Sequence, residues 1–386
     1  EVFATLYHNL GINLASAVYV LMAIYRVHAF NTESTGEGNF RPAVSVFKPV
    51  CGLDVDLYEN LATFCRQDYP QFQVIFGLHN ASDPALPVVR RIIDENPDRD
   101  IALIIDETLS GPNLKVSNLE NMNFAAKHDY LLIADSDMRV DDQYLSRVMA
   151  PFSALDVGVV TCLYKGTAAR GLASILGAMF INSWFLPSVL VSAGMRDVNF
   201  GLGATIAVRR SVLDTIGGFK YLAKYLADDH ILGKRAHEIG FKVVLSGYVV
   251  ENVVFEKSIS ALFRHELRWA RTVRTVEPLG HAFSFIMYGI PLALLATLMV
   301  DLTRDWGLFD ASIIIAAVAL RVGMHITVAR KFGLAHRDRS FWLVPLRDIM
   351  SFVVWAASFF GRNISWKDAS FNVDANGLMV TSDVVK

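Results

Sequence analysis

Charged residues are scarce in this chain of 386 residues, and neither sign dominates. Lysine and arginine number 36 against 38 acidic residues, so the net charge offers no pull toward nucleic acid, and we expect no nucleic-acid partner. Only 19% of the residues are charged, whereas 53% are hydrophobic. This balance excludes an ordinary soluble domain as the whole of the chain, and we expect part of it to lie in a lipid bilayer.

Cysteine is rare as well. The three cysteines, Cys51, Cys65 and Cys162, lack the spacing of a metal site, and their odd number suits a reducing compartment. We interpret all three as small buried apolar side chains.

Long apolar stretches occur toward both ends of the chain. A bilayer crossing takes about 20 residues, and four stretches come close to that length: 2–24, 283–300, 308–328 and 341–360. We expect an N-terminal transmembrane helix within 1–28 and C-terminal transmembrane helices within 281–362. Arginine and lysine follow the first stretch and fill the loop after the third. Because basic loops face the cytoplasm, we expect a multi-pass membrane protein with residues 40–257 on the cytoplasmic face.

Two apolar segments leave alternatives open. Residues 341–360 contain Arg347 and Asp348, which are costly in lipid unless they are paired or face protein or water. This segment is either a true span with an internal ion pair or one that enters and returns, and the side of the tail, 363–386, depends on the answer. Residues 172–193 fit an interfacial helix better than a span, with a buried core helix as the alternative.

Residues 40–257 are mixed in polarity. Short apolar runs lie at 43–47, 73–78, 101–105, 130–134 and 158–163, and helix-like stretches separate several of them. Strands that alternate with helices predict an α/β domain with a mostly parallel sheet, and fully apolar strands predict helices on both faces. Ligands of such sheets bind beyond the carboxyl ends of the strands, which is where Asp135 and Asp137 stand.

Asp135 and Asp137 lie two residues apart and would point to one side of an extended chain. Carboxylates about 4 Å apart repel by about 4 kcal/mol in an effective dielectric of 20. A Mg2+ or Mn2+ ion would offset the repulsion, because these ions take oxygen ligands from one or two carboxylates and substrate phosphates. The diphosphate of a sugar nucleotide would supply those phosphates. The alternative is a solvated turn at the end of a strand.

Three further features suggest a site. Asp228 and Asp229 open a helix-like stretch, where an aspartate either caps the helix or acts as a general base on a hydroxyl, and the pair could do both. Lys115 stands among asparagines, where it could meet a phosphate or belong to a turn. Gly201 and Gly203 precede a strand, at a point where the backbone could approach a ligand closely.

An amphipathic interface helix is expected over 258–280, before the C-terminal apolar stretches. Arg264, Arg268 and Arg271 fall at i, i+4 and i+7, on one helical face. Such a row either contacts lipid headgroups or reaches a diphosphate, for which the forked guanidinium is well suited. Trp269 either anchors at the membrane interface or lines an acceptor pocket.

Eight segments, taken in chain order, resemble the ceramide glucosyltransferase family, family 21 of the glycosyltransferases. They are SVFKPVCGLD, NLATFCRQDYP, ASDPA, NLKVSNL, IADSDMRV, VLDTIGGF, LADDHILGK and HELRW. The bacterial glycosyltransferases associated with hopanoid lipids are similar too. The resemblance implies a GT-A type fold for nucleotide-diphosphate sugars, an inverting reaction and a UDP-sugar donor, in a bacterial inner membrane.

The resemblance also implies roles for single residues. Asp229 matches the general base, and Asp135 and Asp137 match the metal site. The nucleotide-sugar site would comprise Pro49, Asp83, Lys115, Asp135, Gly203, Arg268 and Trp269. Asp228, His265 and Trp184 are candidate acceptor or motif residues. His265 occupies the first position of the family's (Gln/Arg)-x-x-Arg-Trp motif, where it is neither Gln nor Arg.

The resulting expectation is a membrane enzyme that moves a hexose, glucose or similar, from a UDP-sugar onto a lipid hydroxyl. Ceramide is the favoured acceptor and a β-glycolipid the favoured product. The alternatives are transfer of N-acetylglucosamine or another sugar to a hopanoid such as bacteriohopanetetrol, a processive polysaccharide synthase, and a non-enzymatic protein that binds or transports lipid. The sugar and the acceptor stay open at this point.

Overall fold

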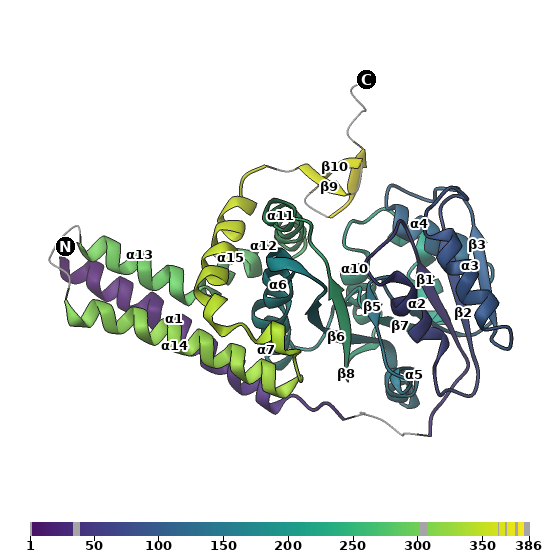
Figure 1. Ribbon diagram of the computed structural model, residues 1–386, viewed down its shortest axis with the longest axis horizontal. Coiled ribbons are helices and arrows are strands. Elements are labelled where there is room, and N and C mark those ends of the chain that lie inside the picture. Colours follow the sequence, from purple (N-terminus) through teal and green to yellow (C-terminus); the bar gives the residue numbers. More distant parts are fainter. Residues whose placement is uncertain are drawn as a thin grey trace. The chain divides into compact units, whose positions relative to one another are not determined.

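The computed structural model describes residues 2–33, 39–301, 307–361, 363–366, 369–374 and 377–381. The chain divides into two compact units, each drawn from three segments of the sequence (Figure 1). The helical unit comprises Glu1–Phe30, Gly166–Met195 and Val254–Arg362, and the sheet unit comprises Asn31–Lys165, Arg196–Val253 and Asn363–Lys386.

The sheet unit is built on an eight-stranded sheet with the order β3-β2-β1-β4-β7-β6-β8-β5. Its strands are β1 (Val44–Pro49), β2 (Phe72–Leu78), β3 (Ile101–Ile105), β4 (Tyr130–Ile133), β5 (Met138–Arg139), β6 (Val157–Ala168), β7 (Ile206–Arg209) and β8 (Lys242–Val254). Strands β3, β2, β1 and β4 are parallel, whereas β7 is antiparallel to β4 and β6. The α/β class predicted from alternating strands and helices is confirmed.

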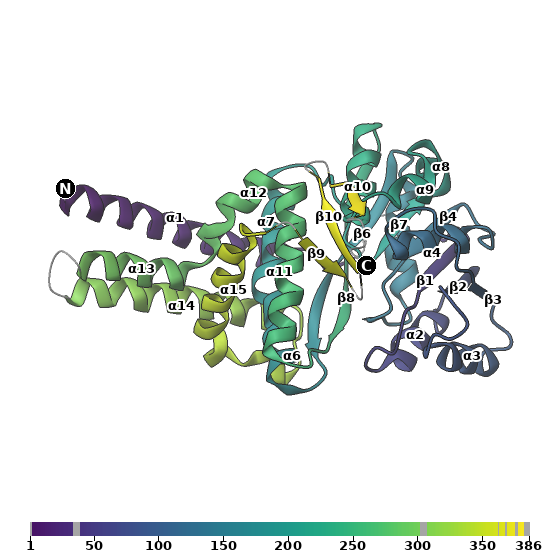
Figure 2. The ribbon, with the colours of Figure 1, turned by 90° about the horizontal axis from the view of Figure 1, so that it is seen from above.

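Helices cover both faces of this sheet (Figure 2). They are α2 (Leu57–Cys65), α3 (Leu86–Glu95), α4 (Leu114–Asn123), α5 (Tyr144–Met149), η1 (Ala150–Ser153), α8 (Arg210–Thr215), α9 (Gly218–Leu222) and α10 (Asp228–Glu238). Helices α2, α3 and α5 pack in one apolar core, and α4, α8, α9 and α10 pack in another. In β1, Val46 belongs to the first core and Phe47 to the second, because successive side chains point to opposite faces of a strand.

A small three-stranded sheet in the order β11-β10-β9 follows near the end of the sheet unit. Its strands are β9 (Asn363–Trp366), β10 (Ala369–Val373) and β11 (Met379–Thr381). Leu378 forms an antiparallel bridge with Tyr225, a residue just ahead of α10. Of the cysteines, Cys65 and Cys162 are buried as expected, whereas Cys51 is exposed because it lies in the loop after β1.

The helical unit contains several long apolar helices. Its elements are α1 (Val2–Ala29), α6 (Gly171–Phe180), η2 (Ile181–Phe185), α7 (Leu186–Met195), α11 (Ile259–Val276), α12 (Pro278–Phe283), η3 (Ser284–Met287), α13 (Gly289–Asp301), α14 (Leu308–Lys331), η4 (His336–Arg339), η5 (Phe341–Leu343) and α15 (Val344–Ser358). In the described residues, four helices are long and apolar enough to cross a membrane: Leu10–Ala29, Gly171–Met195, Leu308–Lys331 and Phe341–Ser358. Two further helices, Pro278–Met287 and Gly289–Met299, are bent by 72° at the break between them and add a fifth span if the pair crosses as one.

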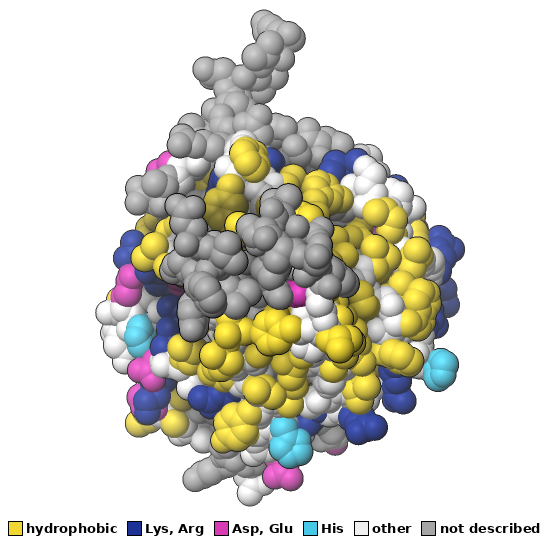
Figure 3. All heavy atoms as spheres, turned by 90° about the vertical axis from the view of Figure 1, so that its left-hand side faces the viewer, with side chains coloured by type: hydrophobic (Ala, Val, Ile, Leu, Met, Phe, Trp, Pro, Cys, Tyr) yellow, Lys and Arg dark blue, Asp and Glu magenta, His cyan; other side chains and the backbone are white. Residues whose placement is uncertain are grey.

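Exposed apolar side chains are common in the helical unit. Hydrophobic side chains cover much of the face in Figure 3, and Lys and Arg side chains lie mainly toward its rim. Leu298 on α13 is 58% exposed and Ile315 on α14 is 68% exposed, fractions that are costly in water over a continuous patch. Together with the long apolar helices, this surface indicates association with a membrane. The interfacial placement of 172–193 stays a prediction, because the helix over that stretch is also long enough to span.

Arg347 and Asp348 do not form the internal ion pair that the sequence suggested as one alternative. Arg347 binds both carboxylate oxygens of Glu266 on α11, at 2.6 and 2.8 Å. Asp348 lies 3.3 Å from Arg321 of α14 and accepts a hydrogen bond from the Trp184 indole at 2.8 Å. The reason is geometric, because consecutive residues of a helix point to different sides and meet different neighbours.

Candidate active site

The Asp135–Asp137 segment forms a turn at the carboxyl end of β4. The last ladder hydrogen bond of this strand runs from the Ala134 N–H to the Phe47 carbonyl, over 3.2 Å. One residue later, the Asp135 carbonyl accepts from the Met138 N–H at 3.4 Å and from the Lys48 ammonium at 2.5 Å. The buried Lys48 side chain therefore holds the turn that presents the two carboxylates.

Asp137 is anchored by a residue far along the sequence. Strand β5 pairs with β8 in a register that sets Met138 opposite Asn252, and the Asn252 amide donates to Oδ2 of Asp137 at 2.9 Å. Burial, reinforced by the charges of Asp135 and Asp54, raises the pKa of Asp137 to about 6. An ionised Asp137 is therefore a buried negative charge near other carboxylates, a condition that a cation would relieve.

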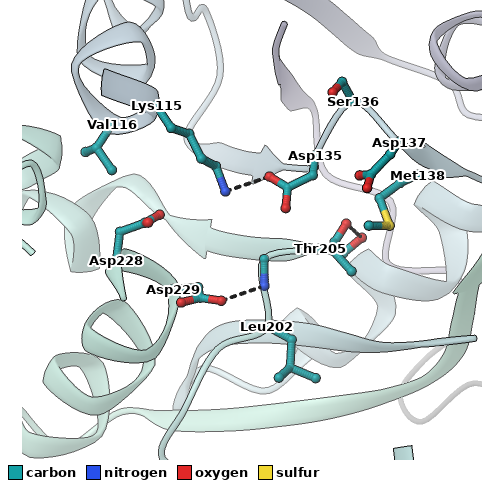
Figure 4. Close-up of polar contacts among 12 residues, drawn as sticks. Lys115, Val116, Asp135, Ser136, Asp137, Met138, Leu202, Thr205, Asp228 and Asp229 are labelled. Atoms are coloured by element: carbon teal, nitrogen blue, oxygen red, sulfur yellow. Dashed lines mark hydrogen bonds and ion pairs between the residues drawn. The ribbon is translucent and has the colours of Figure 1, made fainter. Parts of the chain in front are cut away.

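Asp135 is paired with Lys115 (Figure 4), whose ammonium lies 2.6 Å from Oδ1 of Asp135. Lys115 is the second residue of α4, a helix whose N-cap is Asn113, with the Asn113 side chain accepting from the Val116 N–H. Burial disfavours the charge on Lys115, but Asp135, Asp228 and Asp229 outweigh burial and raise its pKa. This lysine is therefore a fixed cation.

Gly203 is the point around which these groups meet. It lies in a tight turn closed by the Thr205 N–H and the Leu202 carbonyl, ahead of β7. A β-carbon built on Gly203 would lie 3.0 Å from Oδ2 of Asp135, 3.3 Å from Oδ2 of Asp229 and 3.7 Å from Nζ of Lys115. Only a residue without a side chain fits so close to these three polar groups. Gly203 thus lies where Asp135, Asp229 and Lys115, all singled out from the sequence, come together.

Asp229 is held rigidly by main-chain donors. Its Oδ1 accepts from the His230 N–H at 2.8 Å, and its Oδ2 accepts from the Gly203 N–H at 2.9 Å. Burial raises the pKa of Asp229, although Lys115 opposes the rise. Because each oxygen retains a lone pair, this carboxylate can still accept a proton.

Asp228 has a different set of contacts. It is the first residue of α10, whose N-cap is Ala227, so neither aspartate of the pair is the capping residue. Its Oδ1 accepts from the Asn113 amide at 3.2 Å, the same amide that donates to the Tyr225 carbonyl. Burial raises the pKa of Asp228 to about 6, opposed by Lys115 and reinforced by Asp229.

Asp83 organises the loop after β1, the strand that ends at Pro49. Its two carboxylate oxygens accept from the Gly52 N–H at 3.0 and 3.1 Å, and Oδ1 also accepts from the Ala85 N–H at 2.8 Å. Gly52 has a φ of 76°, which favours glycine. In this structure Asp83 therefore joins the loops beyond β1 and β2 at the carboxyl edge of the sheet.

Three site residues escaped the sequence reasoning. Lys48 carried a signal, because a lysine inside an apolar strand is unusual and calls for a buried partner. Asn252 carried none, since only the β5–β8 register brings it to Asp137. Tyr164 on β6 is the third: its pKa is raised by burial and by the carboxylates of Asp229, Asp135 and Asp137.

The motif residues of α11 belong to the helical unit. His265 Nδ1 lies 2.6 Å from Oε1 of Glu256, and its ring centroid lies 4.2 Å from that of Trp269, which stacks on Phe180. Arg268 follows on the same helix. Trp184 is buried among the apolar helices.

The predicted arginine row of α11 has separate partners. Arg271 donates to the Phe360 carbonyl at 2.7 Å, just beyond the end of α15, and Arg264 donates to Ser260. The next arginine along, Arg274, donates to the Gly361 carbonyl at 3.0 Å. Arg271 and Arg274 therefore tie α11 to main-chain carbonyls at and just beyond the end of α15.

The residues present suit a hard divalent cation. Within the part of the chain that the structure describes, no three His, Cys, Asp or Glu side chains gather as a metal-binding group. Asp135 and Asp137 are two carboxylates in one turn, and Mg2+ or Mn2+ is commonly held by such a pair together with substrate phosphates and waters. The chemistry of this donor set therefore fits such an ion, and the Asp135 side chain is 34% exposed, so a ligand can reach it.

Comparison with known proteins gives the family. Residues 9–379 match glycosyl transferase family 21. Ceramide glucosyltransferase 1 of Caenorhabditis elegans is 26% identical over 274 residues, which are 69% of this chain and 58% of that protein. The ceramide glucosyltransferase of Gibberella zeae is 24% identical over 449 aligned positions, covering 87% of this chain and 84% of that protein. The chain thus spans less than two thirds of the length of the worm protein.

A solved structure gives the fold. A mannosyltransferase from Pyrobaculum calidifontis, in complex with GDP-Man and Mn2+, superposes with a TM-score of 0.61 at 17% identity, over 93% of this chain and 99% of that one. At that identity the likeness bears on the fold alone, and it confirms the predicted GT-A type. A match over nearly the whole chain leaves no ambiguity about descent: the chain belongs to glycosyl transferase family 21.

Proposed function

We propose that this protein is an inverting glycosyltransferase that moves a hexose from a UDP-sugar onto a hydroxyl group of a membrane lipid, with ceramide as the first acceptor to test. The observation that carries the proposal is the convergence of three charged groups on Gly203. The carboxylates of Asp135 and Asp229 and the ammonium of Lys115 lie 3.0, 3.3 and 3.7 Å from the position of a β-carbon on that residue. Donor and acceptor chemistry would then meet at one point.

Asp229 would act as the general base. Its carboxylate would take the proton of the acceptor hydroxyl as that oxygen attacks the anomeric carbon in line. The bond between the anomeric carbon and the diphosphate oxygen breaks in the same step, and UDP leaves with the electron pair. A single displacement inverts the anomeric configuration and gives a β-linkage from an α-linked donor. Main-chain hydrogen bonds to both oxygens of Asp229 support this role, because they fix the direction in which it accepts a proton.

The donor side would be arranged around the diphosphate. A Mg2+ or Mn2+ ion held by Asp135 and Asp137 would neutralise charge that develops on the departing diphosphate. Lys115 would add a second positive charge, and Lys48 holds the turn on which both carboxylates stand. Pro49 and Asp83 would border the nucleotide, since the end of β1 and the loop after β2 lie at the same edge of the sheet.

The acceptor side rests on the helical unit. We propose that residues 40–257 form the catalytic domain on the cytoplasmic face of a bacterial inner membrane, with transmembrane helices within 1–28 and 281–362. The amphipathic segment 258–280 would lie at the interface and bring Arg268, Trp269 and His265 to the reaction. The long apolar helices and the family's lipid-modifying members support a lipid acceptor. Trp184 would lie along the route of the lipid.

A matrix of donors and acceptors tests the proposal. Purified protein in detergent, with Mn2+ or Mg2+, is incubated with UDP-glucose, UDP-galactose and UDP-N-acetylglucosamine against ceramide, bacteriohopanetetrol and diacylglycerol, and the products are read by mass spectrometry. We expect one sugar added to one lipid with release of UDP. Asp229→Asn should abolish the product, whereas Asp214→Asn, which changes an exposed aspartate of α8, should not. No product and no UDP release with any pair would reject an enzymatic role, and a polymer would identify a processive synthase.

A further inference from the structure

Lys115 occupies the carboxylate that the proposed cation needs. Its ammonium lies 2.6 Å from Oδ1 of Asp135 and 3.7 Å from the point where a β-carbon on Gly203 would lie. The pair is only partly shielded, since the side chains of Lys115 and Asp135 are 18% and 34% exposed. A ligand can therefore reach it, and Figure 4 shows the lysine extended from α4 toward the turn.

An ammonium and a metal ion that bind the same carboxylate weaken each other's binding. Two positive charges a few ångströms apart repel each other, and a divalent ion doubles the charge product. Binding of a bare cation to Asp135 therefore requires Lys115 to withdraw. Asp228 and Asp229 also attract the ammonium, but the ion pair that it forms is with Asp135.

A nucleoside diphosphate offers Lys115 a better partner. Its phosphate oxygens are accessible acceptors, and an ammonium on them supplements rather than opposes a cation on the same phosphates. We propose that Lys115 is an internal competitor of the cation for Asp135: it weakens the binding of the bare ion, and the nucleotide removes this obstacle by drawing the ammonium away. This inference rests on the proposed function for the identity of the nucleotide, whereas the competition itself does not.

The exchange makes cation and nucleotide binding cooperative. By linkage, UDP should tighten Mn2+ binding by the same factor by which Mn2+ tightens UDP binding. The enzyme would then stay free of metal until the donor arrives, and release of UDP would return Lys115 to Asp135. A lysine with only a structural role predicts something different, because its loss would weaken both ligands.

The test compares wild-type protein with Lys115→Met. Binding of Mn2+ is followed by electron paramagnetic resonance without nucleotide and with saturating UDP, and binding of UDP by calorimetry with and without Mn2+. We expect Lys115→Met to bind bare Mn2+ more tightly, by about 5- to 150-fold, the usual range of a coupling between sites. The same variant should bind UDP more weakly in the presence of Mn2+. The factor by which each ligand tightens binding of the other in wild type should fall toward one in the variant.

Three variants serve as controls. Lys115→Arg keeps the charge and should keep the weak binding of bare Mn2+. Lys127→Met removes a lysine from an exposed ion pair with Asp100 at 2.8 Å and should change nothing. Lys115→Gln repeats the test with a polar neutral side chain, and thermal unfolding identifies any variant that fails to fold.

The outcomes separate the inference from the proposed function. Unchanged or weaker binding of bare Mn2+ in folded Lys115→Met and Lys115→Gln would overturn the competition. Tighter binding of bare Mn2+ in these variants, with no binding of UDP to wild type, would support the competition and reject UDP as the nucleotide of the donor.

Discussion

The main-chain N–H of Gly203 donates a hydrogen bond to Oδ2 of Asp229 over 2.9 Å, and the same residue lies so close to Asp135 that a β-carbon on it would be 3.0 Å from Oδ2 of Asp135. One glycine thus orients the proposed base and lets both carboxylates approach the same point. Gly201, two residues earlier, is equally confined: a β-carbon there would lie 2.6 Å from the Asp229 carbonyl oxygen. The turn and the start of α10 therefore approach each other as closely as glycine permits.

Gly203→Ala should inactivate the enzyme without unfolding it. Its β-carbon would lie 3.0 Å from Oδ2 of Asp135 and 3.3 Å from Oδ2 of Asp229, so both carboxylates must move by a few tenths of an ångström. Misplacement of reacting groups can cost about 100-fold in rate, and we expect a fall in kcat/KM of that order. Gly323→Ala is the control, because a β-carbon there meets nothing within 4 Å and the site is a helix. Normal turnover by Gly203→Ala would contradict this arrangement.

The rate should fall as the pH is lowered. The pKa of Asp228 is raised to about 6 and that of Asp229 is raised as well, chiefly by burial, so the pair takes up protons at a higher pH than free aspartates do. The acidic limb of kcat/KM against pH should report the pair rather than one residue. Asp229→Asn should lose about 10²- to 10⁴-fold at every pH. Asp228→Asn should keep activity and shift the limb to lower pH, because a neighbouring negative charge is gone. The reverse pattern would assign the base to Asp228.

Asp137 should destabilise the metal-free protein at neutral pH. Burial raises its folded-state pKa to about 6, so the folded state holds more protons than the unfolded state between about pH 4 and 6. Stability from this group therefore declines as the pH rises through that window, and the full cost is present above it. Asp137→Asn should raise the Tm at pH 7.5 without cations and leave it unchanged at pH 4. Asp142→Asn, an exposed neighbour, is the control. A lower Tm for Asp137→Asn at pH 7.5 would contradict the prediction.

The buried pair of Glu266 and Arg347 should be costly to break on one side. Both side chains are at most 1% exposed, and Arg347→Met would leave the Glu266 carboxylate without its partner. We expect a loss of about 3 to 5 kcal/mol in the free energy of unfolding. The double variant Glu266→Met with Arg347→Met should recover much of that loss, because it leaves no unpaired charge. Thermal unfolding in detergent measures both, and additive losses would show that the pairing is not what holds these helices.

Much of the fold could be predicted from residue pattern. Fully apolar runs such as the one before Asp135 specify strands buried on both faces, and their alternation with helices specifies the α/β class. The position of Asp135 and Asp137 at the carboxyl end of a strand follows directly, since it depends only on where an apolar run stops. Each of these features depends on a short stretch of sequence, so the order of residues along the chain is enough to predict it.

Other parts of the site could not be predicted, because they depend on contacts between distant segments. The order of β7, β6 and β8 joins strands that lie far apart along the chain, and the antiparallel pairing of β8 with β5 brings Asn252 to Asp137. The partners of Arg347 and Asp348 come from two other helices, although the two residues are neighbours in sequence.

The sequence by itself determined which chemical groups are present: two acidic pairs, a lysine, glycines at a turn and long apolar stretches. Their order resembles that of one family. The tertiary structure decided which of these groups meet. Lys115 lies against Asp135, and both come close to Asp229 at Gly203, because α4 and α10 begin and β4 ends at one edge of the sheet. The physical reason is that a charge acts over a few ångströms, and that distance is fixed by packing rather than by separation along the chain.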